Sequence, residues 1–286
     1  MAVYKRSYTR YAGPKTQIWP RFLILTRYSF ARLFASKLLV LFIAASLFYP
    51  LGCIIYAYLR HNIPFLLALR ISPNGLVPVE GKFFYFYCYI QGGMAYLLTA
   101  VIGPGLVSPD LANGAMPLYF CRPFSRTQYV LGKMCVLLIL LSIITWIPGL
   151  VLYAIQSSLE GWDWFTANFW IAESVFIGLF VWILVLSLIA LAASAWVKWK
   201  IAAGAVILGV FFAGAGFGAA INQVLRTSYG SFLDLTEVIH TIWSDLFRYD
   251  SGSEMSLGGA WIMLAVISAL CCWLLARRIR PFEVIK

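Results

Sequence analysis

Six long apolar stretches without a charged residue constrain the fold of this chain more than any other feature of its sequence. They cover residues 38–59, 83–107, 134–155, 174–197, 201–221 and 257–276. A helix needs about 20 apolar residues to cross the hydrocarbon core of a bilayer. Only 12% of the residues are charged, whereas about a quarter of a soluble domain is charged. We therefore expect an all-α polytopic membrane protein, with six transmembrane helices in a single transmembrane domain, residues 1–286.

Basic residues are spread unevenly over the connections between these stretches. If residues 1–37 lie in the cytoplasm, most of the 22 basic residues fall on the cytoplasmic side, together with both chain ends. The basic residues on the opposite side are Arg60, Arg70, Lys82, Arg226 and Arg248. Membrane proteins retain Lys and Arg in their cytoplasmic connections. The pattern predicts cytoplasmic N and C termini, and it argues against a nucleic-acid-binding surface.

Two segments outside the spans have the character of amphipathic helices. Residues 19–37 mix aromatic and aliphatic residues with spaced arginines, which favours an N-terminal interfacial helix in the headgroup zone. A simple extension of the first span is the alternative. Residues 232–247 place apolar side chains at helical spacing, which predicts an outer amphipathic helix between the fifth and sixth spans. This helix either packs on the bundle as a lid or contributes to a substrate path.

The spans lack the groups that an intramembrane enzyme needs. They contain no Asp, Lys, Arg or His, and Glu173 stands at the outer edge of the fourth span. The chain has neither an HExxH zinc motif nor a GxxxxGK[ST] phosphate-binding loop. The six cysteines show no metal-binding spacing. We therefore expect no catalytic residue, metal or cofactor, and we expect that the chain does not hydrolyse ATP itself.

Glycines in the second and fifth spans predict local features of packing. The sequence Gly103-Pro104-Gly105 predicts a kink near the cytoplasmic end of the second span. In the fifth span Gly209, Gly214 and Gly218 are candidates for close helix packing, and the last two have the small-xxx-small spacing. That packing lies either within one bundle or across a dimer axis along a substrate pathway.

Residues 108–133 form a turn-rich connection between the second and third spans, which we call the elbow. Ser108-Pro109-Asp110 is a good helix start, with a capping serine, proline at the first helical position and a carboxylate. It predicts a short helix over 109–116. Ser125 followed by Gln128 predicts a capping box that opens the helix leading into the third span.

The middle of the elbow offers apolar and aromatic side chains beside arginines. Leu118, Tyr119 and Phe120 are followed by Arg122 and Arg126. Such anchors are typical of a knob that inserts into a partner's pocket. A loop that rests on lipid headgroups through its arginines has the same composition. The residues alone leave both interpretations open.

The elbow resembles the signature region of the membrane subunits of type-2 ATP-binding cassette transporters, the exporter-like permease family. In that family an acidic residue and Gly-Thr precede an apolar helix and the pattern RP-x-SR-x-x-Y-x-x-GK. The matching residues are Asp110, Gly114, Arg122, Pro123, Ser125, Arg126, Tyr129, Gly132 and Lys133. Asp110 stands where Glu is commoner and Ala115 where Thr is usual, which leaves open how the short helix is tethered. The motif covers about 25 residues, while the order of helices matches over nearly the whole chain.

The resemblance implies that the short helix is a coupling helix, which docks on a separate nucleotide-binding ATPase subunit. The residues expected at this interface are Asp110, Leu111, Gly114, Leu118, Tyr119, Phe120, Arg122, Pro123, Ser125 and Arg126. A second permease copy or a homologue, surrounding membrane lipid and a location in the cytoplasmic (inner) membrane are implied as well.

The expected function is that of a permease subunit that exports an amphipathic substrate. The absence of charge from the spans favours a lipid, a lipid-linked glycan or a hydrophobic peptide over an inorganic ion. Such a substrate would pass along the interface between two permease subunits, near the second and fifth spans. The alternative is a non-transporting, membrane-embedded scaffold subunit of a larger complex.

Overall fold

Helices make up every regular element in the part of the chain that the structure describes. The computed structural model describes residues 21–279 except 63, 65, 67–71, 73–75, 122–123, 251 and 253–254. Its helices are α1 Arg21–Phe34, α2 Lys37–His61, α4 Gly81–Ile102, α5 Pro104–Ala112, α6 Met116–Phe120, α7 Arg126–Ile144, α8 Trp146–Glu160, α9 Trp162–Ala167, α10 Phe169–Trp196, α11 Lys200–Leu225, the 3-10 helix η2 Tyr229–Leu233, α12 Leu235–Leu246 and α13 Leu257–Arg278.

The prediction of six membrane-crossing helices is confirmed by length and composition. The six apolar helical segments are Lys37–His61, Gly81–Ala112, Arg126–Glu160, Phe169–Trp196, Lys200–Leu225 and Leu257–Arg278, and each overlaps one predicted stretch. The second segment comprises α4 and α5, and the third comprises α7 and α8. The fold is therefore that of a multi-pass, all-α membrane protein.

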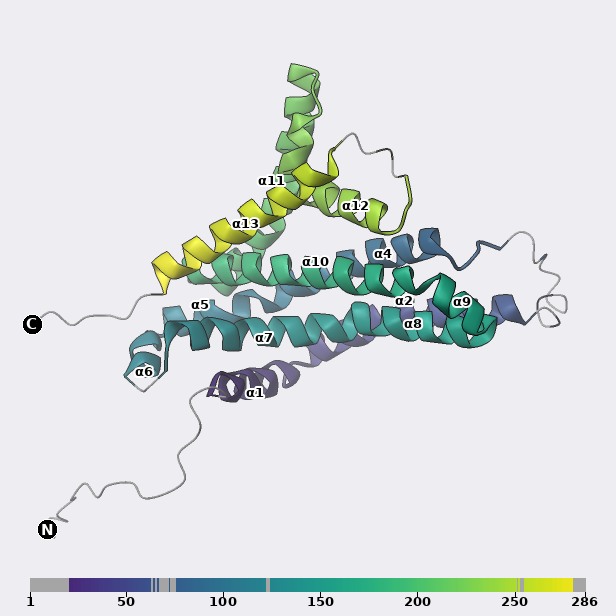
Figure 1. Ribbon diagram of the computed structural model, residues 1–286. Coiled ribbons are helices and arrows are strands. Elements are labelled where there is room, and N and C mark those ends of the chain that lie inside the picture. Colours follow the sequence, from purple (N-terminus) through teal and green to yellow (C-terminus); the bar gives the residue numbers. More distant parts are fainter. Residues whose placement is uncertain are drawn as a thin grey trace, which may run out of the picture.

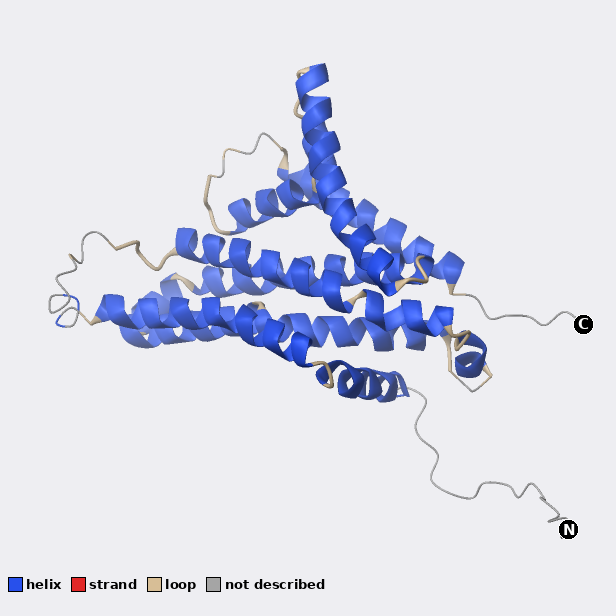
Figure 2. Cartoon of the chain, turned by 180° about the vertical axis from the view of Figure 1, so that it is seen from behind, coloured by secondary structure: helices blue, strands red, loops and turns tan. Residues whose placement is uncertain are grey.

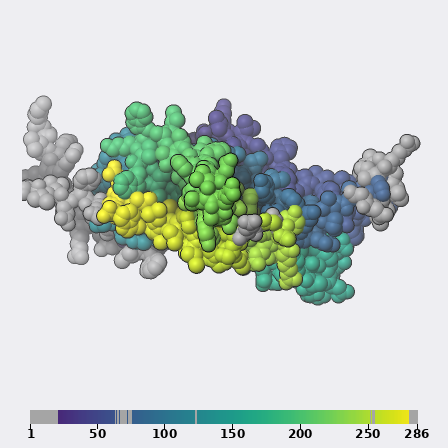
Figure 3. Space-filling model, turned by 90° about the horizontal axis from the view of Figure 1, so that it is seen from above, coloured from purple at the N-terminus to yellow at the C-terminus, as the bar shows by residue number. Residues whose placement is uncertain are grey.

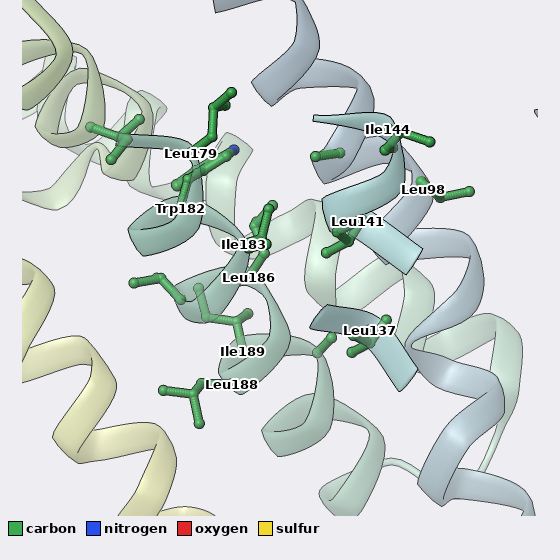
Figure 4. Packing of buried hydrophobic residues seen from close by; sticks show 14 of the residues in the cluster. Leu98, Leu137, Leu141, Ile144, Leu179, Trp182, Ile183, Leu186, Leu188 and Ile189 are labelled. Atoms are coloured by element: carbon green, nitrogen blue, oxygen red, sulfur yellow. The ribbon is translucent and has the colours of Figure 1, made fainter. Parts of the chain in front are cut away.

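Helix α10 lies at the centre of the bundle. It contacts α4, α5, α7, α8, α11 and α13, and Figure 1 shows α4, α7 and α8 running beside it. Leucine and isoleucine side chains of α10, such as Ile183 and Leu186, face Leu137 and Leu141 of α7 (Figure 4). The C-terminal end of α13 lies at the same end of the bundle as α6, as the view from behind also shows (Figure 2).

The second span is interrupted at the position where the sequence predicts a kink. Helix α4 ends at Ile102, and α5 begins at Pro104, whose missing N–H is not needed at a helix start. A Cβ on Gly103 would come 2.6 Å from the Cβ of Ala190, so only glycine allows α10 to pass this closely. The kink is therefore held against α10.

Gln91 satisfies two backbone carbonyls that prolines leave without a helical donor. Proline has no N–H, so Pro50 and Pro148 cannot donate to the carbonyls of Ser46 and Ile144, four residues earlier. The Nε2 atom of Gln91 donates to the Ser46 oxygen at 3.0 Å and also to the Ile144 oxygen. Because unpaired backbone groups are costly in hydrocarbon, this side chain joins α4 to α2 and to the break between α7 and α8.

We expect Gln91→Leu to lower the free energy of unfolding by about 1–3 kcal/mol, because it leaves buried carbonyls unpaired. Unfolding by a denaturing detergent in mixed micelles measures this loss. Adding Pro50→Ala should recover part of it, because the new N–H donates to Ser46 within α2. If Pro50→Ala changed the free energy of unfolding equally in the presence and absence of Gln91, the Ser46 carbonyl would not depend on the Gln91 amide.

Residues 19–37 and 232–247, the two segments predicted as amphipathic helices, each contain a helix outside the six long apolar segments. Helix α1 falls within residues 19–37, and a turn at residues 35–36 separates it from α2, so it is not a continuous extension of the first span. Helix α12 begins at the predicted amphipathic segment, where the Asp234 carboxylate accepts hydrogen bonds from the N–H groups of Thr236 and Glu237. The apolar face of α12 is buried in the bundle.

Candidate functional site

The elbow consists of the end of α5, the short helix α6 and the start of α7. Helix α5 ends in a Schellman motif: the N–H of Ala115 donates to the Asp110 carbonyl at 2.8 Å, and that of Gly114 to Leu111 at 3.3 Å. Gly114 has φ +62°, which a residue with a side chain rarely adopts. This turn redirects the chain into α6.

The predicted helix start at Ser108 is wrong. Helix α5 starts at Pro104, so Ser108 lies inside it. Its hydroxyl donates to the Val197 carbonyl at 2.7 Å, with the Ser194 carbonyl oxygen 2.9 Å away, and its N–H donates to the Ser194 hydroxyl at 2.8 Å. Because the second span is interrupted at Gly103, α5 begins at Pro104, four residues before the predicted start at Ser108. The Ser194 hydroxyl of α10 accepts from the N–H groups of Val107 and Ser108, as a capping residue would. The predicted helix over 109–116 is thus divided between the end of α5 and the start of α6.

The predicted capping box at the start of α7 is confirmed. The N–H of Gln128 donates to the Ser125 hydroxyl at 3.2 Å, and the N–H of Ser125 donates to Oε1 of Gln128 at 3.0 Å. This pair fixes the direction in which the elbow enters the third span.

A buried polar cluster ties α5 to α7. The Lys133 ammonium lies 2.9 Å from the Asp110 carboxylate, and the Tyr129 hydroxyl donates to the same carboxylate at 2.8 Å. Tyr129 and Lys133 are one helical turn apart on α7, and all three side chains are buried. We call Asp110, Tyr129 and Lys133 the tether, because their contacts hold the end of α5 against α7.

Helix α1 is seated on the same part of α7. The Thr26 hydroxyl donates to the Gly132 carbonyl at 2.9 Å. A Cβ on Gly132 would come 2.9 Å from the Phe22 carbonyl oxygen, so a side chain here would push α1 away. The Tyr129, Gly132 and Lys133 matches of the sequence pattern therefore serve contacts inside the chain.

The remaining elbow residues divide into an inner and an outer group. Tyr119 and Phe120 pack on the Tyr129 ring, with centroids 5.4 and 6.4 Å away, and Leu111 is half-buried against the core. Leu118 is 71% exposed. Gly114, Ser125 and Arg126 are also exposed, while Arg122 and Pro123 lie outside the described residues. The structure therefore directs the Asp110 carboxylate inward and leaves Leu118 and Arg126 available to a partner.

The fifth-span glycines occupy two different surroundings. A Cβ on Gly218 would come 2.6 Å from the Gly230 carbonyl oxygen, and one on Gly214 would clash with the Leu233 carbonyl. Both glycines thus accommodate η2 of the same chain. Gly209 would meet nothing within 4 Å. Of these three candidate glycines, Gly209 is the one that faces away from the described parts of its own chain.

A small aromatic cavity of about 150 Å³ lies where α4, α10, α11 and α12 meet. Its ring-bearing lining residues are Tyr89, Tyr96, Trp182, Phe211, His240 and Trp243. Burial lowers the pKa of His240 to about 4, with Asp234 opposing the shift, so the imidazole is neutral near pH 7. The described lining of this cavity therefore carries no charged side chain near pH 7.

The sequence analysis did not anticipate the tether, because it assigned Asp110 to the ATPase interface and gave Tyr129 and Lys133 no site role. Tyr129 and Lys133 matched the family pattern without being placed in a site, and Thr26 and Ser194 carried no signal. The four-residue spacing of Tyr129 and Lys133 on one face of α7, opposite an isolated Asp110, is the pattern that points to it.

Among the described residues no cluster of His, Cys, Asp or Glu could hold a metal ion. No family model matches the chain, and no curated protein matches its sequence. The functional argument therefore depends on the elbow and on the surfaces around it.

Proposed function

We propose that this chain is the membrane-embedded permease subunit of a transporter that a separate ATPase subunit drives. The elbow carries this proposal: it is fastened to the bundle by the tether, yet it presents Leu118 and Arg126 outward. An exposed leucine and an exposed arginine on one elbow are suited to a pocket on a protein partner. The likeness of the elbow to the type-2 family pattern supports the same interpretation.

The contacts of the elbow define how a push on α6 would travel. The tether makes α5 and α7 move together, and α5 continues through the Gly103 kink into α4. Thr26 joins α1 to α7 at the same level. A displacement of α6 by an ATPase therefore reaches the second and third spans as one body, which is the rigid-element movement that coupling needs.

The proposal includes an orientation and a substrate class. The elbow end faces the cytoplasm of an inner membrane, with both termini on that side, because the basic residues gather there. A second copy or a homologue completes the pathway. The substrate is amphipathic and exported; the charge-free apolar stretches, and the pairing of the buried Asp110 with Lys133, leave no free buried charge for an inorganic ion in the described part of the chain.

We expect Leu118→Glu to abolish stable association with the ATPase, because it places a carboxylate where an apolar pocket would close. Affinity purification of the tagged chain in mild detergent, followed by mass spectrometry, identifies the ATPase and measures its loss. Tyr119 is unsuitable for this test because it packs on Tyr129.

Trp199→Glu is the matched control, because Trp199 is an exposed apolar residue between α10 and α11, outside the elbow. It should retain the ATPase. If no ATPase with a phosphate-binding loop is recovered from the unsubstituted chain, even with non-hydrolysable ATP, the transporter function is wrong. A scaffold subunit would then be the better explanation.

A further inference from the structure

A partly open cavity of about 260 Å³ lies at the elbow end, lined by α1 and by parts of α2, α4, α5, α6, α7 and α11. Its lining residues include Tyr28, Ser29 and Arg32 of α1, Tyr119 of α6, and the basic residues Lys133 of α7 and Lys200 of α11. Helix α1 lies along this side of the bundle (Figure 2). The cavity is thus a place where hydroxyl donors and cations converge.

The cavity has more positive than negative charge. Asp110 is its one acidic lining residue, and the Asp110 carboxylate is already paired with Lys133. Neither Arg32 nor Lys200 forms an ion pair with any described residue. The Lys200 ammonium lies over the start of α5, 3.8 Å from where a Gly105 Cβ would stand. Two cations are therefore left for an anionic ligand.

An apolar groove continues from this cavity. It has a volume of about 570 Å³ and is lined by Phe42 of α2, Leu97 and Val101 of α4, and Ile201 and Leu208 of α11, among others. Val101 and Lys200 line both spaces, so the groove and the cavity meet there. Ile201 is 89% exposed, and α11 stands clear of the bundle over much of its length (Figures 1 and 3).

We propose that the cavity and groove form one binding site for an anionic phospholipid of the surrounding membrane. The phosphate lies between Arg32 and Lys200, because guanidinium and ammonium groups are strong donors to phosphate oxygens. One acyl chain follows the groove between α2, α4 and α11. A free phosphate would use the cations alone and would leave the apolar groove without a role.

This site does not depend on an ATPase partner. A lipid bound between α1, α5 and α11 contacts the same α1–α7 unit that Thr26 and the tether hold together. Its presence is therefore measurable on the purified chain alone, and its absence would leave the proposed function untouched.

The test uses the full chain in neutral detergent with a fluorescent phosphatidylglycerol as the probe. Unlabelled phosphatidylglycerol should displace the probe, whereas diacylglycerol, which lacks the phosphate, and inorganic phosphate, which lacks the chains, should not at equal concentration. We expect Arg32→Gln with Lys200→Gln to weaken binding by about tenfold or more, since two charge-assisted contacts are lost.

The matched control is Arg27→Gln with Lys198→Gln. Arg27 lies on α1, as Arg32 does, and Lys198 lies in the turn before α11, two residues before Lys200. Both are exposed, carry the same charges as Arg32 and Lys200, and do not line the cavity. The control should bind the probe as the unsubstituted chain does. Equal weakening by both pairs would show attraction to general surface charge, and displacement by inorganic phosphate would show an anion site without a lipid; either result overturns the proposal.

Discussion

Lys133→Met is expected to destabilise the protein by about 3–5 kcal/mol, one of the two largest effects that the structure predicts. The substitution leaves the Asp110 carboxylate buried without its cation, and a buried charge that loses its partner costs that much. Tyr129 would still donate one hydrogen bond, which cannot replace the ammonium. Reversible unfolding by a denaturing detergent in mixed micelles measures the change.

A double substitution separates the charge from the packing. Asp110→Asn combined with Lys133→Met removes both charges, and it should regain a large part of the lost stability, because replacing a buried ion pair as a whole is often nearly neutral. Lys198→Met, at an exposed position, should change the free energy of unfolding by less than about 0.5 kcal/mol. If Lys133→Met and the double variant were equally unstable, the ion pair would not be what holds α5 to α7.

The tether also makes a functional prediction distinct from that of Leu118. On the proposed function, the double variant keeps the exposed face of the elbow, so it should still bind the proposed ATPase subunit. Because α5 and α7 would no longer be fastened by charge, ATP hydrolysis should drive less transport. Binding without transport is the result that identifies a coupling role rather than a docking role.

The parts of the fold that were predictable depend on local sequence. The six spans follow from apolar length, and the capping box at Ser125 follows from four consecutive residues. The α5 start was missed because it depends on Ser194, which approaches Ser108 only in the folded bundle. Gln91 shows the same limit, since its two carbonyl partners belong to helices far away in sequence.

In the candidate site, too, the exposed residues were predictable from the sequence, whereas the contacts between helices were not. Leu118 and Arg126 were expected to be exposed, and they are. Asp110 was grouped with them because the family pattern lists it beside the coupling helix. The packing of α5 against α7 shows that the Asp110 carboxylate faces Tyr129 and Lys133. The partner of a charged side chain depends on which residues lie near it in the fold, and the family pattern along the chain does not contain that information.

Substituting the fifth-span glycines by alanine is expected to give effects of opposite sign at neighbouring positions. Gly214→Ala with Gly218→Ala places each Cβ against a backbone carbonyl, of Leu233 and Gly230, that cannot rotate away. We expect the pair to lower the free energy of unfolding by about 2–6 kcal/mol, since each overpacked position costs about 1–3 kcal/mol. Proteolysis near residues 226–234 should increase as η2 separates from α11.

Gly209→Ala with Gly216→Ala is the matched control on the same helix. Neither added Cβ meets an atom within 4 Å, so the higher helix propensity of alanine should raise stability by up to about 1 kcal/mol at each position. A loss of stability from this pair would contradict the placement of α11. The larger change Gly209→Leu then tests whether α11 contacts a second copy of the chain. If self-association weakens while the free energy of unfolding is unchanged, Gly209 lies at a contact between subunits. If self-association is unchanged, the packing role belongs to Gly214 and Gly218, which accommodate η2.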